Sequence, residues 1–276
     1  MRRFVNPGNT AFEVAVNSQI YVDKTGLLAY TNSVINTKQA LICSSRPRRF
    51  GKSITADMLC AYYSSGCDSD SIFASYEIAK SDSYKKHLNQ YDVIYLDIQW
   101  CMMDAGSAEQ TVSYLNYHVI EELKEIYPQI LPDGIRTAYG AMSCINAQTG
   151  VKFIVIIDEW DVLIRDEAQN QAVQENYINF LRGLFKGTEP TKYIALAYLT
   201  GILPIKKMKT QSALNNFDEF TMLSAGNMAP YVGFTESEVK MLAKKYHQNY
   251  EKVKRWYDGY LLNEHQIYNP RAVVGV

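Results

Sequence analysis

The chain has 276 residues, of which 47% are hydrophobic and 21% are charged, so its composition excludes a disordered protein and allows a sizeable core. A net charge of -1 removes any global electrostatic argument for nucleic-acid or membrane-surface binding, and no run approaches the roughly 18 apolar residues of a membrane span. Five scattered cysteines without a CxxC pair argue against a disulfide framework or a zinc site, and we expect a protein of the reducing cytoplasm.

Short apolar runs alternate along the chain with longer segments of helical period, which is typical of an α/β domain built on a mainly parallel sheet. Four runs are predicted as strands: residues 40–43, 93–98, 153–157 and 193–199. The third run, Phe-Ile-Val-Ile-Ile, has no polar alternation, so we expect a central strand with both faces buried.

The segments between these runs carry helical periodicity and end at residues that stop helices. Helices are predicted over residues 53–65, 108–127, 135–147 and 171–186. Glycine tolerates the left-handed residue past the last turn, and proline cannot continue a helix. The stop residues are Gly66, Pro128, Gly150 and Gly187.

After residue 205 the sequence becomes rich in lysine and polar turn residues. Thr235 followed by Glu238 fits a capping box, which predicts a helix over residues 235–250. We therefore expect residues 1–205 to form the α/β core and residues 206–276 to form a small helical C-terminal subdomain. The last residues are an apolar run without a polar tail, which favours a truncated chain.

A basic loop lies between the first predicted strand and the first predicted helix, and it contains Gly51-Lys52-Ser53. The order strand, loop, Gly-Lys-Ser, helix is that of a P-loop, in which loop amides and the helix N-terminus hold phosphates. Lys52 would reach the β- and γ-phosphates, and the Ser53 hydroxyl would bind Mg²⁺. Arg46 stands where the usual motif has its first glycine, and a solvated basic loop is the alternative. The residues expected to contact ATP are Arg46, Arg48, Arg49, Phe50, Gly51, Lys52, Ser53 and Ile54.

Two adjacent carboxylates, Asp158 and Glu159, end the third predicted strand. Ligands of open α/β sheets bind at the carboxyl ends of the strands, where Asp158 would support Mg²⁺ and Glu159 would act as the general base for water. Neighbouring residues of a strand point to opposite faces, so we expect the two acids to serve different partners. Surface acids that merely cap a strand are the alternative.

The fourth predicted strand ends in Thr200 and Gly201. Thr200 would sense the γ-phosphate, and a plain Thr-Gly turn is the alternative. A further cation is expected to neutralise charge in the transition state, and spacing does not select among the candidates. These candidates are Arg165, Arg182, Lys206 and Lys207.

Eight segments of the chain together carry a family resemblance. They are Tyr21-Val22-Asp23-Lys24-Thr25, Arg46-Pro47-Arg48-Arg49-Phe50-Gly51-Lys52-Ser53, Ile157-Asp158-Glu159-Trp160-Asp161, Leu199-Thr200-Gly201, Leu214-Asn215-Asn216, Gly233-Phe234-Thr235, Trp256-Tyr257-Asp258-Gly259-Tyr260 and Tyr268-Asn269-Pro270. In this order they resemble the predicted AAA-ATPase-like family of bacteria over nearly the whole chain. The resemblance implies a P-loop NTPase fold that binds ATP, with Arg46 as the family's own form of the phosphate loop.

The resemblance also bears on partners. Members of the family often carry a PD-(D/E)XK nuclease-like domain after this region, and this chain stops before one could begin. The chain departs from the family at Trp160, where tyrosine is common, and at Arg271, where an aromatic residue often follows Asn-Pro. The first change keeps a large aromatic side chain, and the second weakens only the C-terminal alignment.

We therefore expect Mg²⁺-dependent ATP binding and hydrolysis in a switch or motor, with Lys52, Glu159 and Thr200 as the catalytic residues. The alternative is a nucleotide-dependent regulatory module with little or no hydrolysis, which controls an attached nuclease-like or other effector. Homo-oligomer formation and contact with nucleic acid stay open, and no membrane partner is expected.

Overall fold

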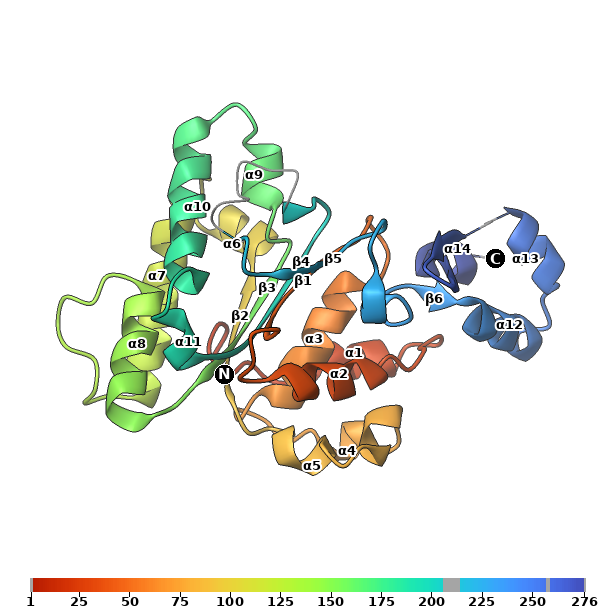
Figure 1. Ribbon diagram of the computed structural model, residues 1–276, viewed down its shortest axis with the longest axis horizontal. Coiled ribbons are helices and arrows are strands. Elements are labelled where there is room, and N and C mark those ends of the chain that lie inside the picture. The colour runs from red at the N-terminus through yellow and green to blue at the C-terminus, as the bar shows by residue number, and fades with distance from the viewer. Residues whose placement is uncertain (1, 206–213, 257–258, 276) are drawn as a thin grey trace.

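The computed structural model describes residues 2–205, 214–256 and 259–275. Its centre is a five-stranded parallel sheet with the strand order β2-β3-β4-β1-β5 (Figure 1). The strands are β1 (Leu41–Ser45), β2 (Asp92–Asp97), β3 (Phe153–Asp158), β4 (Ile194–Gly201) and β5 (Asp218–Phe220). The predicted α/β fold with a mainly parallel sheet is confirmed, together with its four strands. The three-residue β5 was not predicted.

β3 is the central strand that its sequence predicts, because all six of its residues are buried. Phe153, Val155 and Ile157 pack into the hydrophobic core on one face of the sheet. Ile154 and Ile156 pack into a second core on the opposite face. A strand without polar alternation thus supplies apolar side chains to both cores, which explains why no polar position interrupts it.

Helices cover both faces of the sheet (Figure 1). One face packs against α6 (Ile98–Asp104), α7 (Thr111–Ile126), α8 (Ala138–Thr149), α9 (Val162–Asp166), α10 (Gln171–Phe185) and α11 (Pro190–Tyr193). The other face packs against α1 (Thr10–Val16), α2 (Gly26–Val34), α3 (Lys52–Tyr63), α4 (Asp70–Phe73), η1 (Glu77–Lys80) and α5 (Tyr84–His87). The four helices predicted for the core are present as α3, α7, α8 and α10.

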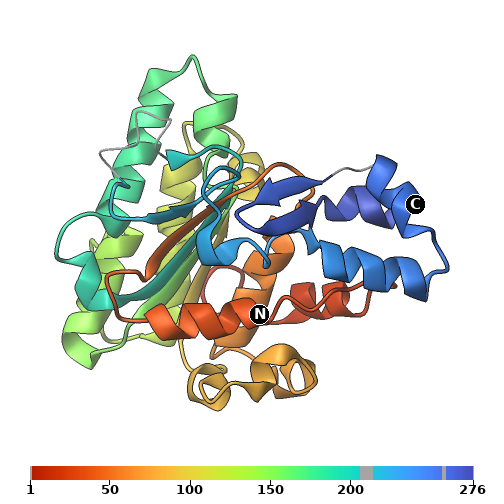
Figure 2. The same cartoon turned by 45° about the vertical axis from the view of Figure 1, so that its right-hand side comes forward.

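The C-terminal part combines helices with a small antiparallel sheet of order β6-β8-β7, and it lies beside α3 and the end of β1 (Figure 2). Its elements are η4 (Gly226–Met228), β6 (Phe234–Thr235), α12 (Glu236–Lys245), α13 (Tyr250–Trp256), β7 (Tyr260–Leu262), β8 (His265–Tyr268) and α14 (Pro270–Val274). A purely helical subdomain is therefore not what the structure shows, since strands of two to four residues are too short to leave a periodic pattern.

The predicted capping box is present at the start of α12, where Thr235 and Glu238 bond each other's backbone amides. The single helix predicted over residues 235–250 is wrong, because α12 ends at Lys245 and α13 begins at Tyr250. His247 between them has a φ of 56°, a left-handed conformation that a helix cannot continue through.

The chain returns to the core after the boundary predicted at residue 205, because β5 pairs with β1. Within the described residues, no helix has both the length and the apolar character that crossing a bilayer requires.

Candidate functional site

The loop that joins β1 to α3 bends sharply in front of Lys52. Arg49 has a φ of 70° and Gly51 a φ of 84°, so both adopt the left-handed conformation that glycine favours. The Lys52 side chain folds back along the loop, where its Nζ donates a hydrogen bond to the Pro47 carbonyl oxygen at 3.1 Å. The hydrogen bond from Lys52 to Pro47 thus joins the two ends of the loop, and α3 begins directly after the loop, at Lys52.

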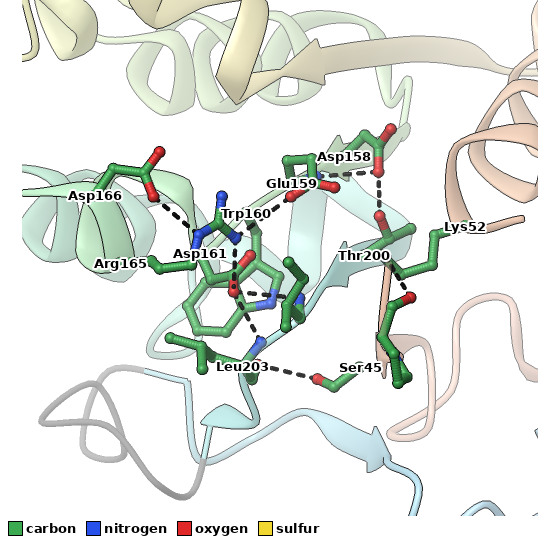
Figure 3. Close-up of polar contacts among 12 residues, drawn as sticks. Ser45, Lys52, Asp158, Glu159, Trp160, Asp161, Arg165, Asp166, Thr200 and Leu203 are labelled. Atoms are coloured by element: carbon green, nitrogen blue, oxygen red, sulfur yellow. Dashed lines mark hydrogen bonds and ion pairs between the residues drawn. The ribbon is translucent and has the colours of Figure 1, made fainter. Parts of the chain in front are cut away.

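Lys52 is coupled to the acids that end β3. Only 5% of Lys52 is exposed, and burial lowers the pKa of its ammonium group. The charges of Glu159 and Asp158 oppose that shift. Lys52 and the two carboxylates line the same cavity, and Figure 3 draws them together. The cation therefore sits in a poorly solvated position, where an anionic ligand would interact with it strongly.

Asp158 and Glu159 line one cavity instead of opposite faces of a strand. β3 ends at Asp158, and Glu159 has a φ of 51°, so the backbone leaves the strand before the alternation of side chains applies. The expectation of opposite faces is wrong for this reason. The two carboxylates still have different neighbours, because Asp158 points to Thr200 and Glu159 points to Arg165 (Figure 3). Burial raises the pKa of Glu159, and Lys52 opposes this shift.

Thr200 is fully buried at the end of β4 and donates its hydroxyl hydrogen to Asp158 Oδ1. β4 lies between β1 and β3, so this residue stands between the phosphate loop and the acids. The γ-phosphate contact predicted for Thr200 stays a prediction. In this structure the hydroxyl bonds to Asp158 and orients that carboxylate.

We expect Thr200→Val to lower the free energy of unfolding by about 1–3 kcal/mol, because Asp158 would remain buried without one of its hydrogen-bond donors. Urea unfolding followed by circular dichroism measures the change. Thr200→Ser keeps the hydroxyl and should retain most of the stability. A Thr200→Val protein as stable as the parent would contradict the expectation.

Asp161 fastens the end of β3 to the segment that follows β4. Its Oδ2 accepts hydrogen bonds from the backbone amides of Ile202 at 3.2 Å and Leu203 at 2.8 Å. Arg165 Nη1 lies 3.4 Å from the same oxygen and 3.5 Å from Glu159 Oε2. Arg165 is therefore the candidate cation that the structure brings to the acids.

The other candidate cations lie elsewhere. Arg182 is exposed on α10, where its Nη1 donates to Asn179 Oδ1 at 2.6 Å. Lys206 and Lys207 fall outside the described residues.

Gly201 allows the ends of β3 and β4 to approach closely. A Cβ at this position would lie 2.6 Å from Trp160 Nε1 and 2.7 Å from Asp161 Oδ1, which are impossibly short contacts. We expect Gly201→Ala to lower the free energy of unfolding by about 1–3 kcal/mol through overpacking, measured by thermal unfolding. Unchanged stability would mean that Trp160 and Asp161 have room to shift.

Arg46 is buried behind the phosphate loop, contrary to its predicted role in ATP binding. Its side chain is 0% exposed, and Nη1 donates to the carbonyl oxygens of Ser45 at 3.2 Å and Phe220 at 3.1 Å. Burial lowers the pKa of its guanidinium to about 10. Because Phe220 ends β5, Arg46 extends the short pairing between β1 and β5 instead of reaching the ligand side of the loop.

A cavity of about 670 Å³ opens in front of the loop and is formed by three parts of the chain. This volume is in the range of small-molecule sites. The first wall is the segment before α2, and the second consists of the phosphate loop and the strand ends. The third comes from the C-terminal part: Tyr231, Gly233, Phe234, Pro270, Arg271 and Val274. Seven of the predicted ATP-contacting residues line this cavity: Arg48, Arg49, Phe50, Gly51, Lys52, Ser53 and Ile54.

The comparisons with known proteins agree with this geometry. The family model described as "Predicted AAA-ATPase" matches residues 8–210. The chain belongs to this family. It is also 24% identical over 262 residues to a protein of Azotobacter chroococcum mcd 1 described as "Uncharacterized protein in vnfD 5'region". That match covers 91% of this chain and 46% of the relative, so the chain spans about half the length of the curated relative.

The residues of this predicted AAA-ATPase that could support Mg²⁺ are oxygen donors. Ser53 and Asp158 line the cavity from α3 and β3, and hydroxyl and carboxylate oxygens are the ligands that Mg²⁺ prefers. Among the described residues, no three His, Cys, Asp or Glu side chains gather as a metal-binding group. This donor set fits a Mg²⁺ ion that takes one or two protein ligands and completes its shell with phosphate and water.

Sequence reasoning missed Asp97 in the predicted AAA-ATPase site. Asp97 ends β2, lines the cavity, and accepts a hydrogen bond from the Trp100 amide at 2.9 Å. Burial raises the pKa of Asp97. The signal was an acid one residue before the end of the predicted strand 93–98, close in kind to the acid after the strand 153–157 that identified Asp158.

Phe50 joins the phosphate loop of the predicted AAA-ATPase to its C-terminal part. Only 1% of this side chain is exposed, and its ring lies 5.7 Å from that of Tyr260. It packs in a small apolar core whose other buried members are Ala225, Ala229, Val232, Leu262 and Ile267. The loop that would hold phosphate is therefore anchored in both parts of the molecule.

Proposed function

We propose that the cavity binds ATP with Mg²⁺ and that the chain hydrolyses the bond between the β- and γ-phosphates to give ADP and phosphate. The observation that carries the proposal is the position of Lys52. It closes the loop at the start of α3 and shares one cavity with Asp158 and Glu159. A cation, loop amides and carboxylates gathered at the carboxyl ends of parallel strands are the groups that phosphoryl transfer requires.

Each side chain has a separate task in this proposal. Lys52 neutralises the β- and γ-phosphates, and Ser53 and Asp158 hold Mg²⁺, which supplies charge neutralisation when it is bound. Thr200 keeps Asp158 oriented through its hydroxyl. Glu159 accepts the proton of the attacking water, for which a pKa raised by burial suits a general base better than an ordinary carboxylate.

In this proposal Arg165 controls the charge state of Glu159. Its Nη1 lies 3.5 Å from Glu159 Oε2 and 3.4 Å from Asp161 Oδ2, and Arg165 itself lines the cavity. When it pairs with Glu159, it holds the base in its charged form. If it turns toward the cavity, the same guanidinium can neutralise phosphate charge.

A regulatory module with little or no hydrolysis is the second candidate. It is favoured by the third wall of the cavity, because Phe234, Pro270, Arg271 and Val274 would touch a bound nucleotide from the C-terminal part. Occupancy of the cavity would then set the position of that part. A cytoplasmic location, a homo-oligomer and an attached effector stay predictions under either candidate.

Isothermal titration with ATP, with and without Mg²⁺, tests binding, and phosphate release by the purified chain tests hydrolysis. Mg²⁺-dependent binding with turnover above buffer supports the first candidate. Binding without turnover favours the second. Absence of binding would refute both.

A further inference from the structure

One sequence motif near the N-terminus has no part in the chemistry proposed above. Residues 19–24 run between the core and the C-terminal helices, where Tyr246 donates its hydroxyl hydrogen to the Gln19 carbonyl oxygen at 2.8 Å. Val22 is buried in a small apolar core with residues of the C-terminal part, among them Phe234 and Val239. The segment is thus one of the places where the two parts of the molecule meet.

Asp23 and Thr25 fasten this segment to the core. Asp23 Oδ1 accepts hydrogen bonds from the Thr25 amide at 2.8 Å and the Thr25 hydroxyl at 2.7 Å. The backbone amides of η1 complete the attachment, because Glu77 donates to Asp23 Oδ2 at 2.8 Å and Ile78 donates to Thr25 Oγ1 at 3.1 Å. The backbone around Lys24 is therefore fixed relative to the core sheet.

Lys24, between these two residues, bonds to the C-terminal part. Its Nζ lies 2.7 Å from the Pro230 carbonyl oxygen, 2.7 Å from Glu238 Oε1 and 2.6 Å from Glu238 Oε2. An ammonium group has three hydrogens to donate, so these three acceptors use its full capacity. Lys24 lines the cavity, but its ammonium group donates all its hydrogen bonds to protein atoms. It is therefore a positioning residue and not a phosphate ligand.

The ion pair is largely shielded from water, since the Lys24 and Glu238 side chains are only 12% and 20% exposed. Burial lowers the pKa of Lys24, and Glu238 opposes that shift. A shielded charge that loses its partner is costly, whereas a surface ion pair contributes little. Glu238 is also the third helical residue of α12, so the contact fixes the helix that follows the cavity residue Phe234.

We propose that Lys24 and Glu238 form a latch that fastens the C-terminal part over the cavity and sets the rate at which nucleotide leaves it. The inference rests on the proposed nucleotide site for its ligand. The contact itself is independent of that site. Opening the latch would free the wall that contains Phe234 while leaving the phosphate loop and the β3 acids in place.

The test uses the full chain and a fluorescent ATP analogue, with dissociation followed by stopped flow. We expect Lys24→Met to raise the dissociation rate constant by about 10-fold or more, because losing a shielded ion pair would let the cavity wall that contains Phe234 move away from the ligand. Lys24→Arg keeps the cation and should stay close to the parent. Glu238→Gln keeps an acceptor for the capping box and should behave like Lys24→Met, so a folding defect in one variant does not decide the result.

Lys240→Met is the matched control, because Lys240 pairs with Glu236 at 3.0 Å on the exposed face of the same helix. It should leave the dissociation rate unchanged. If the parent binds the analogue and both latch variants release it at the parental rate, the latch is overturned.

Hydrogen exchange measured without nucleotide tests the latch independently of the proposed nucleotide binding. Residues 231–243 should exchange faster in Lys24→Met than in the parent and Lys24→Arg, while β3 and β4 remain protected. A parent that binds no nucleotide refutes the proposed function alone, and exchange then decides the latch. Parental exchange in Lys24→Met would overturn it.

Discussion

Lys52→Ala is expected to weaken ATP binding by about 100-fold or more in isothermal titration, while the protein stays folded. The ammonium closes the phosphate loop and is 5% exposed, so its attraction to phosphate acts in a poorly solvated site. Without it, Asp158 and Glu159 would repel the phosphates with one fewer cation to oppose them.

Lys38→Ala is the matched control, since Lys38 is an exposed cation outside the cavity. It should cost much less affinity than Lys52→Ala. Equal affinity in Lys52→Ala and the parent would reject the phosphate-loop assignment.

Glu159→Gln is expected to slow hydrolysis by about 100-fold or more without weakening ATP binding, because glutamine keeps the size of the side chain but cannot accept the proton. Single-turnover hydrolysis and titration separate the two effects. The parent should also lose activity as the pH falls through the pKa of Glu159, which burial raises, since only the carboxylate form is a base. The activity of the glutamine variant should lack this dependence.

Glu167→Gln serves as the control for Glu159→Gln, because Glu167 is an acid outside the cavity at the end of α9. Hydrolysis at the parental rate in Glu159→Gln would contradict the general-base assignment. Loss of ATP binding in that variant would instead assign Glu159 to the ligand site.

The sequence predicted those parts of the molecule that follow from local patterns. The apolar run 153–157 could only be a central strand, and Gly51-Lys52-Ser53 after a strand required a loop before a helix. The same patterns located the acids of the site, because strand ends of a parallel sheet share one edge. Lys52, Ser53, Asp158 and Glu159 lie in one cavity for that reason.

The remaining features depend on contacts between distant segments. Arg46 could be assigned to phosphate from its place in the loop, but β5, which accepts its hydrogen bond, is a three-residue strand without a pattern. The role of Thr200 depended on where its hydroxyl points, which a strand-end motif does not specify. The Lys24–Glu238 contact joins positions 214 residues apart and has no local signature.

The burial of Phe50 makes the shape of the ligand site depend on the C-terminal part as well as on the core. This side chain belongs to the phosphate loop by sequence, yet its packing partners Ala225, Val232 and Ile267 all lie beyond residues 8–210, which the family model matches. The preceding residue, Arg49, holds a left-handed conformation that is unfavourable for a residue other than glycine and needs support from its surroundings. In this structure the loop is therefore supported by the last quarter of the chain, and we expect a fragment of residues 8–210 to contain the motif without that support.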